Sequence, residues 1–138
     1  MNTEDYVSWE LAKQLAKKGF NWKCDTYYDY QGKLCQYATT DVINRNTNGH
    51  GRQRKSAPTL NQAQKWLREV HDIHIVVHPY VVANNNTLYY RQIWHNIHDK
   101  PVDGCNKVNF KTYEEALSDA LVKALELIEP NSVIKEDK

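Results

Sequence analysis

The sequence predicts an α+β protein in which helices pack on a mainly antiparallel sheet. Apolar residues recur with helical spacing in three stretches, which start near Ser8, Thr59 and Thr112. After each of the first two stretches come pairs of shorter segments in which apolar and polar residues alternate, the pattern of half-buried strands. Turn residues, Gly32 in one pair and Asn84–Asn86 in the other, separate the two segments. The predicted order is two αββ units followed by a C-terminal helix.

Composition bounds the class of protein. The chain has 138 residues, of which 41% are hydrophobic and 25% charged, with a formal net charge of +1. These values predict a single soluble domain over residues 1–130 and a charged tail at 131–138. We find no apolar run of the ~18 residues that a membrane span needs, and no signal peptide, so we expect a cytoplasmic protein without a membrane partner. Three cysteines without a CxxC pair fit reduced thiols.

The first αββ unit begins with a helix over Ser8–Lys18, because Val7, Leu11 and Leu15 share one face. Gly19 follows it at the position where a left-handed backbone costs least. Alternation then predicts a strand over Phe20–Asp25. After a turn that ends at Gly32, we expect the second strand of the hairpin at Leu34–Ala38.

The second unit begins with a helix capped by Thr59 and Gln62, which form a capping box. Its predicted apolar face consists of Leu60, Ala63, Trp66, Leu67 and Val70. From Ile73 the period changes to two, which indicates a strand. The Asn84–Asn86 run predicts a hairpin tip and Leu88–Ile97 the returning strand. Pro79 lacks an amide donor, so it predicts an edge position or a bulge and an interruption of the sheet.

Three further segments complete the prediction. The segment Asn44–Ser56 lacks periodicity and contains two glycines, so we expect a mobile loop. His98–Asn109 is a second predicted loop. Thr112 and Glu115 form another capping box, which starts a last helix that ends before Pro130.

No arrangement of residues predicts a catalytic site. A metal-dependent hydrolase would use His74, His78 and His95, but His74 and His78 lie about 13 Å apart along a strand and His95 must come from the neighbouring strand. We therefore expect solvated histidines and no metal. Cys24 and Cys35 lack a nucleophile signature. Whether the protein is an enzyme stays open, with no catalytic residue and no cofactor predicted.

A basic, aromatic pattern predicts ligand binding instead. Residues Val42–Arg68 contain no Asp or Glu, and arginine and lysine side chains hold phosphate well. Tyrosine and tryptophan rings offer faces on which bases stack. The predicted phosphate ligands are Arg45, Arg52, Arg54 and Lys55, and the predicted stacking residues are Tyr27, Tyr28, Tyr90 and Trp94. The opposing interpretation is a solvated loop beside ordinary strand aromatics.

Three segments carry a resemblance to known proteins. They read YVSWELAKQLAKKGF, APTLNQAQKWLREVHDIHI and TYEEALSDALVKALELI, in that order along the chain. Together they resemble a family of small proteins encoded by phages and prophages of anaerobic gut bacteria. That family has no established activity, so no residue role follows from it. The resemblance implies an accessory protein that acts in the host cytoplasm.

We therefore expect a non-catalytic binding protein. One hypothesis is that it sequesters a host nucleotide signal of antiviral defence. A second is that an exposed Tyr/Trp surface binds and inhibits a host protein. A third hypothesis is a homodimer in which the basic region of one copy meets the acidic last helix of the other.

Overall fold

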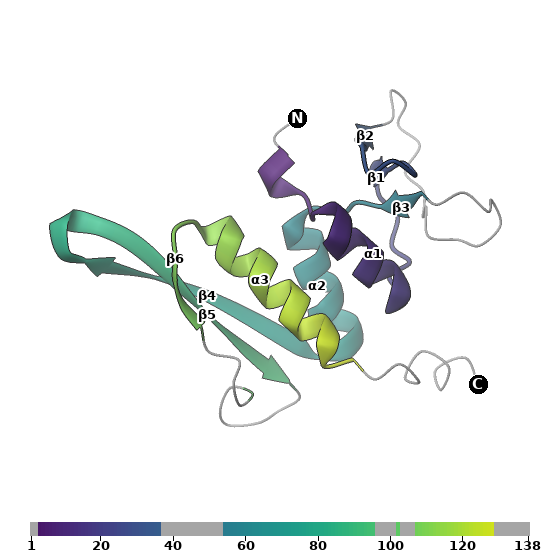
Figure 1. The fold of residues 1–138 in the computed structure, drawn as a ribbon. Coiled ribbons are helices and arrows are strands. Elements are labelled where there is room, and N and C mark those ends of the chain that lie inside the picture. The colour runs from purple at the N-terminus through teal and green to yellow at the C-terminus, as the bar shows by residue number, and fades with distance from the viewer. Residues whose placement is uncertain (1–2, 37–53, 96–101, 103–106, 129–138) are drawn as a thin grey trace. The chain divides into compact units, whose positions relative to one another are not determined.

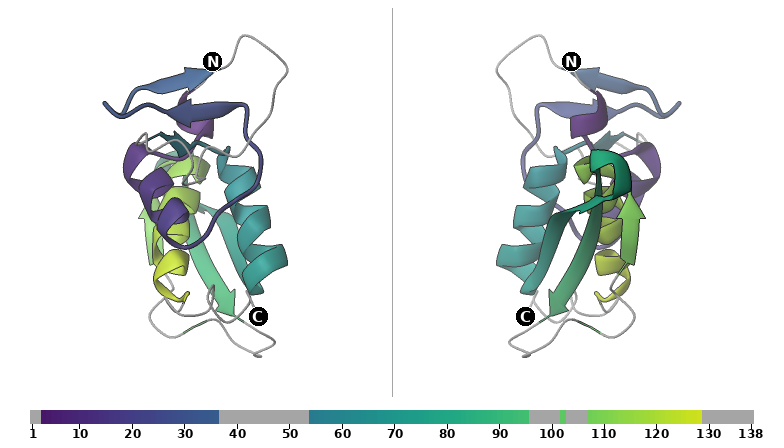
Figure 2. Two further views of the ribbon diagram at one scale, coloured as in Figure 1. Left: turned by 90° about the vertical axis from the view of Figure 1, so that its right-hand side faces the viewer. Right: turned by 90° about the vertical axis from the view of Figure 1, so that its left-hand side faces the viewer.

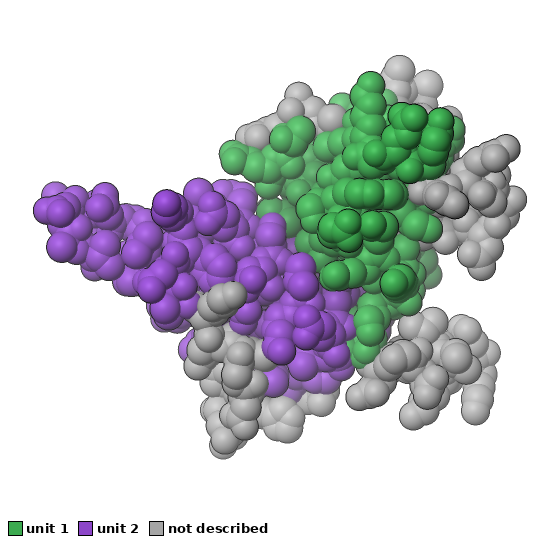
Figure 3. Space-filling model, viewed as in Figure 1, with its two compact units in different colours: residues 1–62, 128–138 green, residues 63–127 purple. Residues whose placement is uncertain are grey.

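The structure is a computed structural model that describes residues 3–36, 54–95, 102 and 107–128 (Figure 1). The chain divides into two compact units, which Figure 3 colours separately. The first unit comprises residues 1–62 and 128–138, and the second comprises residues 63–127. Each unit contains a three-stranded antiparallel sheet, and α3 is the C-terminal helix. The predicted α+β class with a C-terminal helix is confirmed.

The first unit places a helix ahead of three short strands. Its elements are a 3₁₀ turn at Thr3–Asp5, α1 (Trp9–Lys17), β1 (Thr26–Tyr28), β2 (Leu34–Gln36) and β3 (Lys55–Ser56). The sheet order is β2-β1-β3. The Ser8 hydroxyl accepts a hydrogen bond from the amide of Leu11 at 3.1 Å, which caps α1. Gly19 follows the helix with a φ of 93°, as the sequence predicts.

Two predictions for the first unit were wrong. No strand covers Phe20–Asp25; the first strand begins only at Thr26, whose carbonyl and hydroxyl both bond the backbone of Ala57. The predicted loop Asn44–Ser56 also ends in a strand, because Lys55–Ser56 pair with β1. This pairing partner lies 27 residues or more along the chain and leaves no local sequence signal. Residues 37–53, including Ala38 and most of the loop, lie outside the described residues.

The second unit contains most of α2 and a longer sheet. Its elements are α2 (Leu60–His71), β4 (Ile73–Val82), a 3₁₀ turn at Ala83–Asn85, β5 (Asn86–His95), β6 (Lys107–Phe110) and α3 (Tyr113–Glu126). The sheet order is β4-β5-β6. In the right-hand view of Figure 2 both α2 and α3 lie behind this sheet. The prediction of helices on one face of an antiparallel sheet describes this unit well.

The β4–β5 hairpin follows the predicted turn chemistry. Asn84 and Asn85 have φ values of 68° and 59°, the left-handed conformation that asparagine tolerates. Pairing runs without a shift from Ile73 opposite His95 to Val82 opposite Asn86. Pro79 pairs with Tyr89 within this register, so the predicted interruption of the sheet was wrong. The predicted edge position is confirmed, since β4 pairs with β5 on one side only within the described residues.

The last strand was not predicted. Lys107–Phe110 fall partly in the expected loop His98–Asn109, yet they form β6 beside β5. The register shifts between Tyr89 and Arg91, and Asn109 has a φ of 73°, as in a β-bulge. This edge strand pairs only at two positions, and its sequence shows no alternation long enough to indicate a strand.

Both predicted capping boxes are half formed. The hydroxyls of Thr59 and Thr112 accept from the amides of Gln62 and Glu115 at 3.1 and 3.0 Å. The reciprocal bonds are not made to the caps, because the Gln62 side chain donates to Lys23 O at 3.0 Å and the Glu115 carboxylate accepts from Lys111 N at 3.4 Å. The Glu115 side chain therefore holds the residue just before its helix, whereas the Gln62 side chain holds a distant segment at Lys23.

Each unit has its own set of buried apolar side chains. In the first they include Val7, Leu11, Leu15, Phe20 and Ala57, and in the second Trp66, Leu67, Ile73, Ile93, Leu117, Leu121 and Leu125. Val70 was predicted on the buried face of α2, but 41% of it is exposed. It lies in the last turn of the helix, where the chain turns into β4 through Asp72 with a φ of 55°.

Candidate binding surface

The register of the β4–β5 hairpin divides its side chains between two faces. Paired residues in an antiparallel sheet share a face, and successive residues alternate. One face carries Ile73, Ile75, Ile93 and Arg91, which are buried. This is the face beneath α3, because the Arg91 side chain bonds Asp119 of that helix. We call the other side the open face; it consists of His74, Val76, His78, Tyr80, Leu88, Tyr90, Gln92 and Trp94.

Aromatic rings dominate one end of the open face. The His78 and Tyr90 rings stack, with centroids 4.9 Å apart and planes at 21°. The Tyr80 ring lies 6.0 Å from the Tyr90 ring at 49°. Tyr90 therefore has two ring neighbours, both from β4, and lies among preordered aromatic side chains. All three side chains are only half-buried, so they remain accessible to a ligand or partner.

The Tyr80 hydroxyl is hydrogen-bonded to Asn109 of β6. It accepts from the backbone amide of Asn109 at 3.1 Å and also bonds the Asn109 side-chain oxygen. Asn109 is the bulge residue of β6, while Tyr80 belongs to β4 on the other side of β5. One side chain thus bridges the full width of the sheet, which limits the rotamers available to Tyr80.

The other end of the open face holds a histidine and the only tryptophan of the sheet. His74 pairs with Trp94 across the strands. The His74 Nε2 atom lies 2.7 Å from a carboxylate oxygen of Asp72. This contact orients the imidazole at the end of the sheet. Both side chains are solvent-exposed at this end of the sheet, which lies directly after α2.

The three histidines of the metal-dependent alternative do not lie on one face of the sheet. His74 and His78 share the open face, but His95 pairs with Ile73 and therefore lies on the opposite face. The strand register, which the sequence could not give, separates them. Among the described residues no group of three or more His, Cys, Asp or Glu side chains could hold a metal ion.

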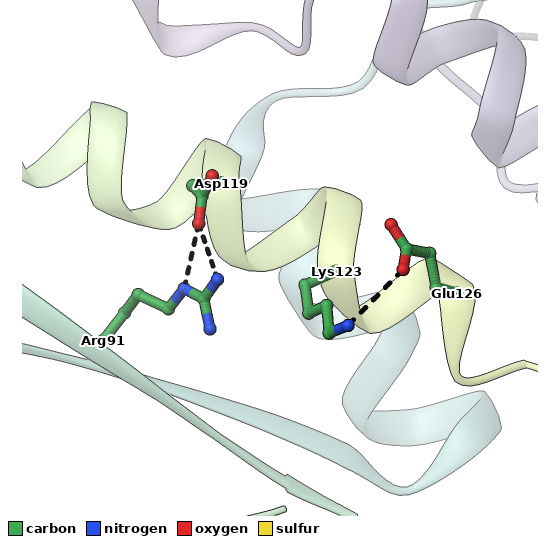
Figure 4. Close-up of polar contacts among 4 residues, drawn as sticks. All are labelled: Arg91, Asp119, Lys123 and Glu126. Carbon is green, nitrogen blue, oxygen red and sulfur yellow. Dashed lines mark hydrogen bonds and ion pairs between the residues drawn. The ribbon is translucent and has the colours of Figure 1, made fainter. Parts of the chain in front are cut away.

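The covered face is fastened by a buried ion pair (Figure 4). Arg91 is only 4% exposed, and its Nη2 and Nε atoms donate to one carboxylate oxygen of Asp119 at 2.6 and 3.2 Å. The charge on Arg91 is thus matched inside the unit by α3. The Arg91–Asp119 ion pair joins β5 to α3, so α3 covers the side of the sheet opposite the open face.

The predicted nucleotide site is divided between the two units. Tyr90 and Trp94 lie on the open face of the second unit, whereas Tyr27, Tyr28, Arg54 and Lys55 belong to the first. Tyr28 is buried, and its hydroxyl donates to Val7 O at 2.6 Å, so the prediction that it stacks a base was wrong. Burial also raises the pKa of Tyr28. Arg45 and Arg52 lie outside the described residues.

The remaining first-unit residues form a small cation–aromatic contact. The exposed guanidinium of Arg54 lies over the Tyr27 ring, 5.5 Å from its centroid. Lys55, the next residue, pairs with Tyr28 in the sheet. A second contact of the same kind joins the Lys13 ammonium to the Trp9 ring at 5.0 Å.

The cysteines offer no activated nucleophile among the described residues. Cys24 is buried, and this burial raises its pKa to about 12. A thiol with so high a pKa is protonated at neutral pH and therefore unreactive. Cys35 is partly exposed on β2, with its sulfur 3.4 Å from Lys33 O.

No protein-family model, curated protein or solved structure matches this chain. In the part of the chain that the structure describes, no helix has both the length and the apolar character that a membrane crossing requires. A proposal about function therefore has to rest on the side chains of the open face.

The sequence indicated four members of the open face, Tyr90 and Trp94 as stacking residues and His74 and His78 as solvated histidines, but not that they share one face. Tyr90 and Trp94 were predicted as stacking residues from their type alone. His78 and Tyr80 are two residues apart on β4, a spacing that places them on one face of the strand. Their approach to Tyr90 depends on pairing across the Asn84–Asn85 turn, and that register was not readable from the sequence.

Proposed function

We propose that this is a phage-encoded accessory protein that acts in the host cytoplasm by binding a host protein, without catalysis, through the open face of the β4–β5 sheet. One observation carries the proposal: Tyr80, Tyr90 and Trp94 gather on a sheet face that neither helix of the unit covers. Tyrosine and tryptophan are the residues most often found at the energetic centre of protein interfaces. The phage origin rests on the sequence resemblance.

Charge favours a protein partner over a phosphate-bearing ligand. None of the eight side chains of the open face is Lys, Arg, Asp or Glu. Binding of nucleic acid depends mainly on cationic side chains that neutralise phosphates. An uncharged aromatic face instead matches an uncharged, partly apolar surface, which loses little hydration energy when it is buried.

The preordered rings also favour this function. Tyr80 is held by Asn109, and Tyr90 is stacked on His78. Rings that are ordered before binding lose little side-chain entropy in the complex, so more of the contact energy contributes to affinity. The same face would suit a rigid partner surface that needs no rearrangement of the sheet.

The test is a measured affinity for an identified partner. A host protein captured with the parent chain is purified, and its Kd is determined by calorimetry for the parent, Tyr90→Ala and Trp94→Ala. We expect each variant to weaken binding more than about tenfold, as interface hot spots do. Tyr113→Ala is the matched control, because Tyr113 is an exposed tyrosine of α3, the helix on the covered side.

Two outcomes would overturn the proposal. One is a partner whose affinity is unchanged in Tyr90→Ala and Trp94→Ala while both variants remain folded. The other is a loss that Tyr113→Ala reproduces, which would place the interface on the helical side. Circular dichroism of each variant separates lost binding from lost structure.

A second candidate function is sequestration of a nucleotide by the first unit. The observation that favours it is the exposed Arg54 guanidinium over the Tyr27 ring, followed by Lys55. A guanidinium takes phosphate bidentately, and a tyrosine ring beside it could stack a base.

Calorimetry against cyclic and ADP-ribose-type nucleotides tests this candidate. A Kd tighter than about 1 mM that weakens in Arg54→Ala would support it. Lys13→Ala is the matched control, since Lys13 makes the equivalent cation–aromatic contact with Trp9. Equal loss in both variants, or no binding below about 1 mM, would exclude nucleotide binding at Arg54.

A further inference from the structure

The β4 edge of the second sheet has an unusual composition. Its ten residues, IHIVVHPYVV, are rich in β-branched side chains and include no Lys, Arg, Asp or Glu. Long uncharged edge strands of this kind pair readily with a second chain, and proteins usually protect them with charges. Because β4 has no charged side chain, another feature must protect its edge from pairing with a second chain.

Two hydrogen bonds reveal which backbone groups point outward along this edge. In an antiparallel sheet the N–H and C=O of one residue point to the same side, and successive residues alternate. Ile93 O accepts from Val102 N at 2.7 Å, on the side of β5 away from β4. The residues of β5 that alternate with Ile93 therefore form the hydrogen bonds to β4. The backbone N–H and C=O groups of their partners His74, Val76 and His78 point toward β5. Backbone groups that point away from β5, toward the outer edge, belong to Ile73, Ile75, Val77, Pro79 and Val81.

A contact from α2 independently supports this assignment. The Gln64 side-chain amide donates to Ile75 O at 3.1 Å. A carbonyl used by the helix in this way is not available to the ladder of an added strand. Ile75 therefore belongs to the outward set, as the alternation from Ile93 requires.

The proline occupies the same outward set. Pro79 is four residues from Ile75, so its ring nitrogen points away from β5. This position explains why the β4–β5 ladder continues past it without a shift: the missing donor belongs to the outer edge. For an added strand, the Ile75 carbonyl is already hydrogen-bonded to Gln64 and Pro79 has no N–H donor. Only Val77, between them, has both backbone groups available.

We infer that Gln64 and Pro79 guard the β4 edge and keep a second copy of this chain from pairing along it. An antiparallel partner strand needs consecutive outward residues with both groups available, and the guards break that series at alternate positions. The guard is independent of what binds the open face, because face and edge use different groups of β4. Without the guards, the uncharged strand would pair with β4 of another copy.

The test removes both guards. Light scattering on the full chain compares the parent with Gln64→Ala/Pro79→Val. We expect the double variant to gain mass with concentration, as a dimer or larger species, while the parent does not. The matched control is Gln64→Glu/Pro79→Val, which also loses the side-chain donor but places a charge at the edge. We expect this control to keep the parent's mass.

Hydrogen exchange on the parent keeps the inference testable if the variants unfold. The amides of Val77 and Val81 should exchange fast and those of Val76 and His78 slowly, because only the second pair bonds β5. Slow exchange at Val77 and Val81 in the parent would overturn the inference, since the edge would already be paired. A folded double variant that keeps the parent's mass would overturn it too, as would association of the glutamate control.

Discussion

The two units are built to one plan but use their aromatic residues differently. Each places three antiparallel strands after a helix. In the first unit the strands have two or three residues, and Tyr28 is buried with its hydroxyl bonded to Val7 O. In the second unit two strands have ten residues, and Tyr80, Tyr90 and Trp94 lie on the open face. Strand length decides this difference, because a long hairpin offers two faces and one helix layer covers only one of them.

Tyrosines in the two units also differ in burial and in what their hydroxyls bond. A buried ring whose hydroxyl bonds a backbone carbonyl contributes to folding and is unavailable to a partner. A half-buried ring that is stacked on a neighbour keeps an accessible face. Substitutions at buried and at accessible side chains should therefore differ in their effect on stability.

The largest effect is expected at the ion pair beneath the covered face. Asp119→Ala leaves the buried charge of Arg91 without its carboxylate. We expect a loss of about 3 kcal/mol in the free energy of unfolding, the lower end of the range for a broken buried pair, because Asp119 is itself partly exposed. Chemical denaturation measures it.

The control for this prediction lies on the same helix. Lys123 and Glu126 form an exposed ion pair at 3.5 Å (Figure 4). Glu126→Ala should cost less than about 0.5 kcal/mol, because surface pairs are screened by water. Equal losses in Asp119→Ala and Glu126→Ala would contradict the role given to the Arg91 pair.

The next effect tests the buried tyrosine of the first unit. Tyr28→Phe removes the donor to Val7 O and leaves that carbonyl unsatisfied in a buried environment. We expect a loss of about 1.5 kcal/mol in the free energy of unfolding. Tyr30→Phe is the control, because Tyr30 is 67% exposed at the β1–β2 turn, and we expect no measurable change. An unchanged free energy of unfolding in Tyr28→Phe would mean that this hydroxyl is hydrated rather than bonded to Val7 O.

A smaller effect is expected for the tyrosine that spans the second sheet. Tyr80→Phe removes the bonds to Asn109, but both residues are accessible to water, which can replace them. We expect a loss of about 0.5 kcal/mol. Hydrogen exchange should nevertheless become faster at Asn109, since its amide loses the tyrosine oxygen. An unchanged exchange rate there would show that Tyr80 does not hold β6.

The buried thiol predicts a pH dependence. Below pH 9 Cys24 is protonated in both the folded and the unfolded chain. Between pH 9 and about 12 only the unfolded chain loses the proton, because burial raises the folded pKa to about 12. The unfolded state then binds fewer protons, so stability falls as pH rises through this window. Cys24→Ala should remove that part of the decline, as measured by denaturation at pH 8 and pH 10.5.

Alkylation gives a second measure of the same thiol. With iodoacetamide at pH 8, peptide mapping should find Cys35 modified and Cys24 protected in the folded chain. Rapid modification of Cys24 would contradict its burial. Both thiols should react fully after denaturation, which controls for the reactivity of the peptides themselves.

The candidate surface was predictable only in part. Tyr90 and Trp94 were found because their residue type suits stacking, and the hairpin that carries them was indicated by alternation and the asparagine turn. The grouping with Tyr27, Tyr28 and Arg54 was wrong in one member, because burial of Tyr28 depends on its bond to Val7, 21 residues away. The relative position of the histidines was not readable either, because the strand register places His95 on the face opposite His74.

The local features of this protein follow from its sequence. The Ser8, Thr59 and Thr112 caps, the left-handed Gly19 and the asparagine hairpin tip all depend on interactions within about four residues. The tertiary structure alone decided the third strand of each sheet, the fate of each tyrosine and the face that α3 covers. These features depend on pairing between distant segments, where a shift of one residue would exchange the two faces of a strand.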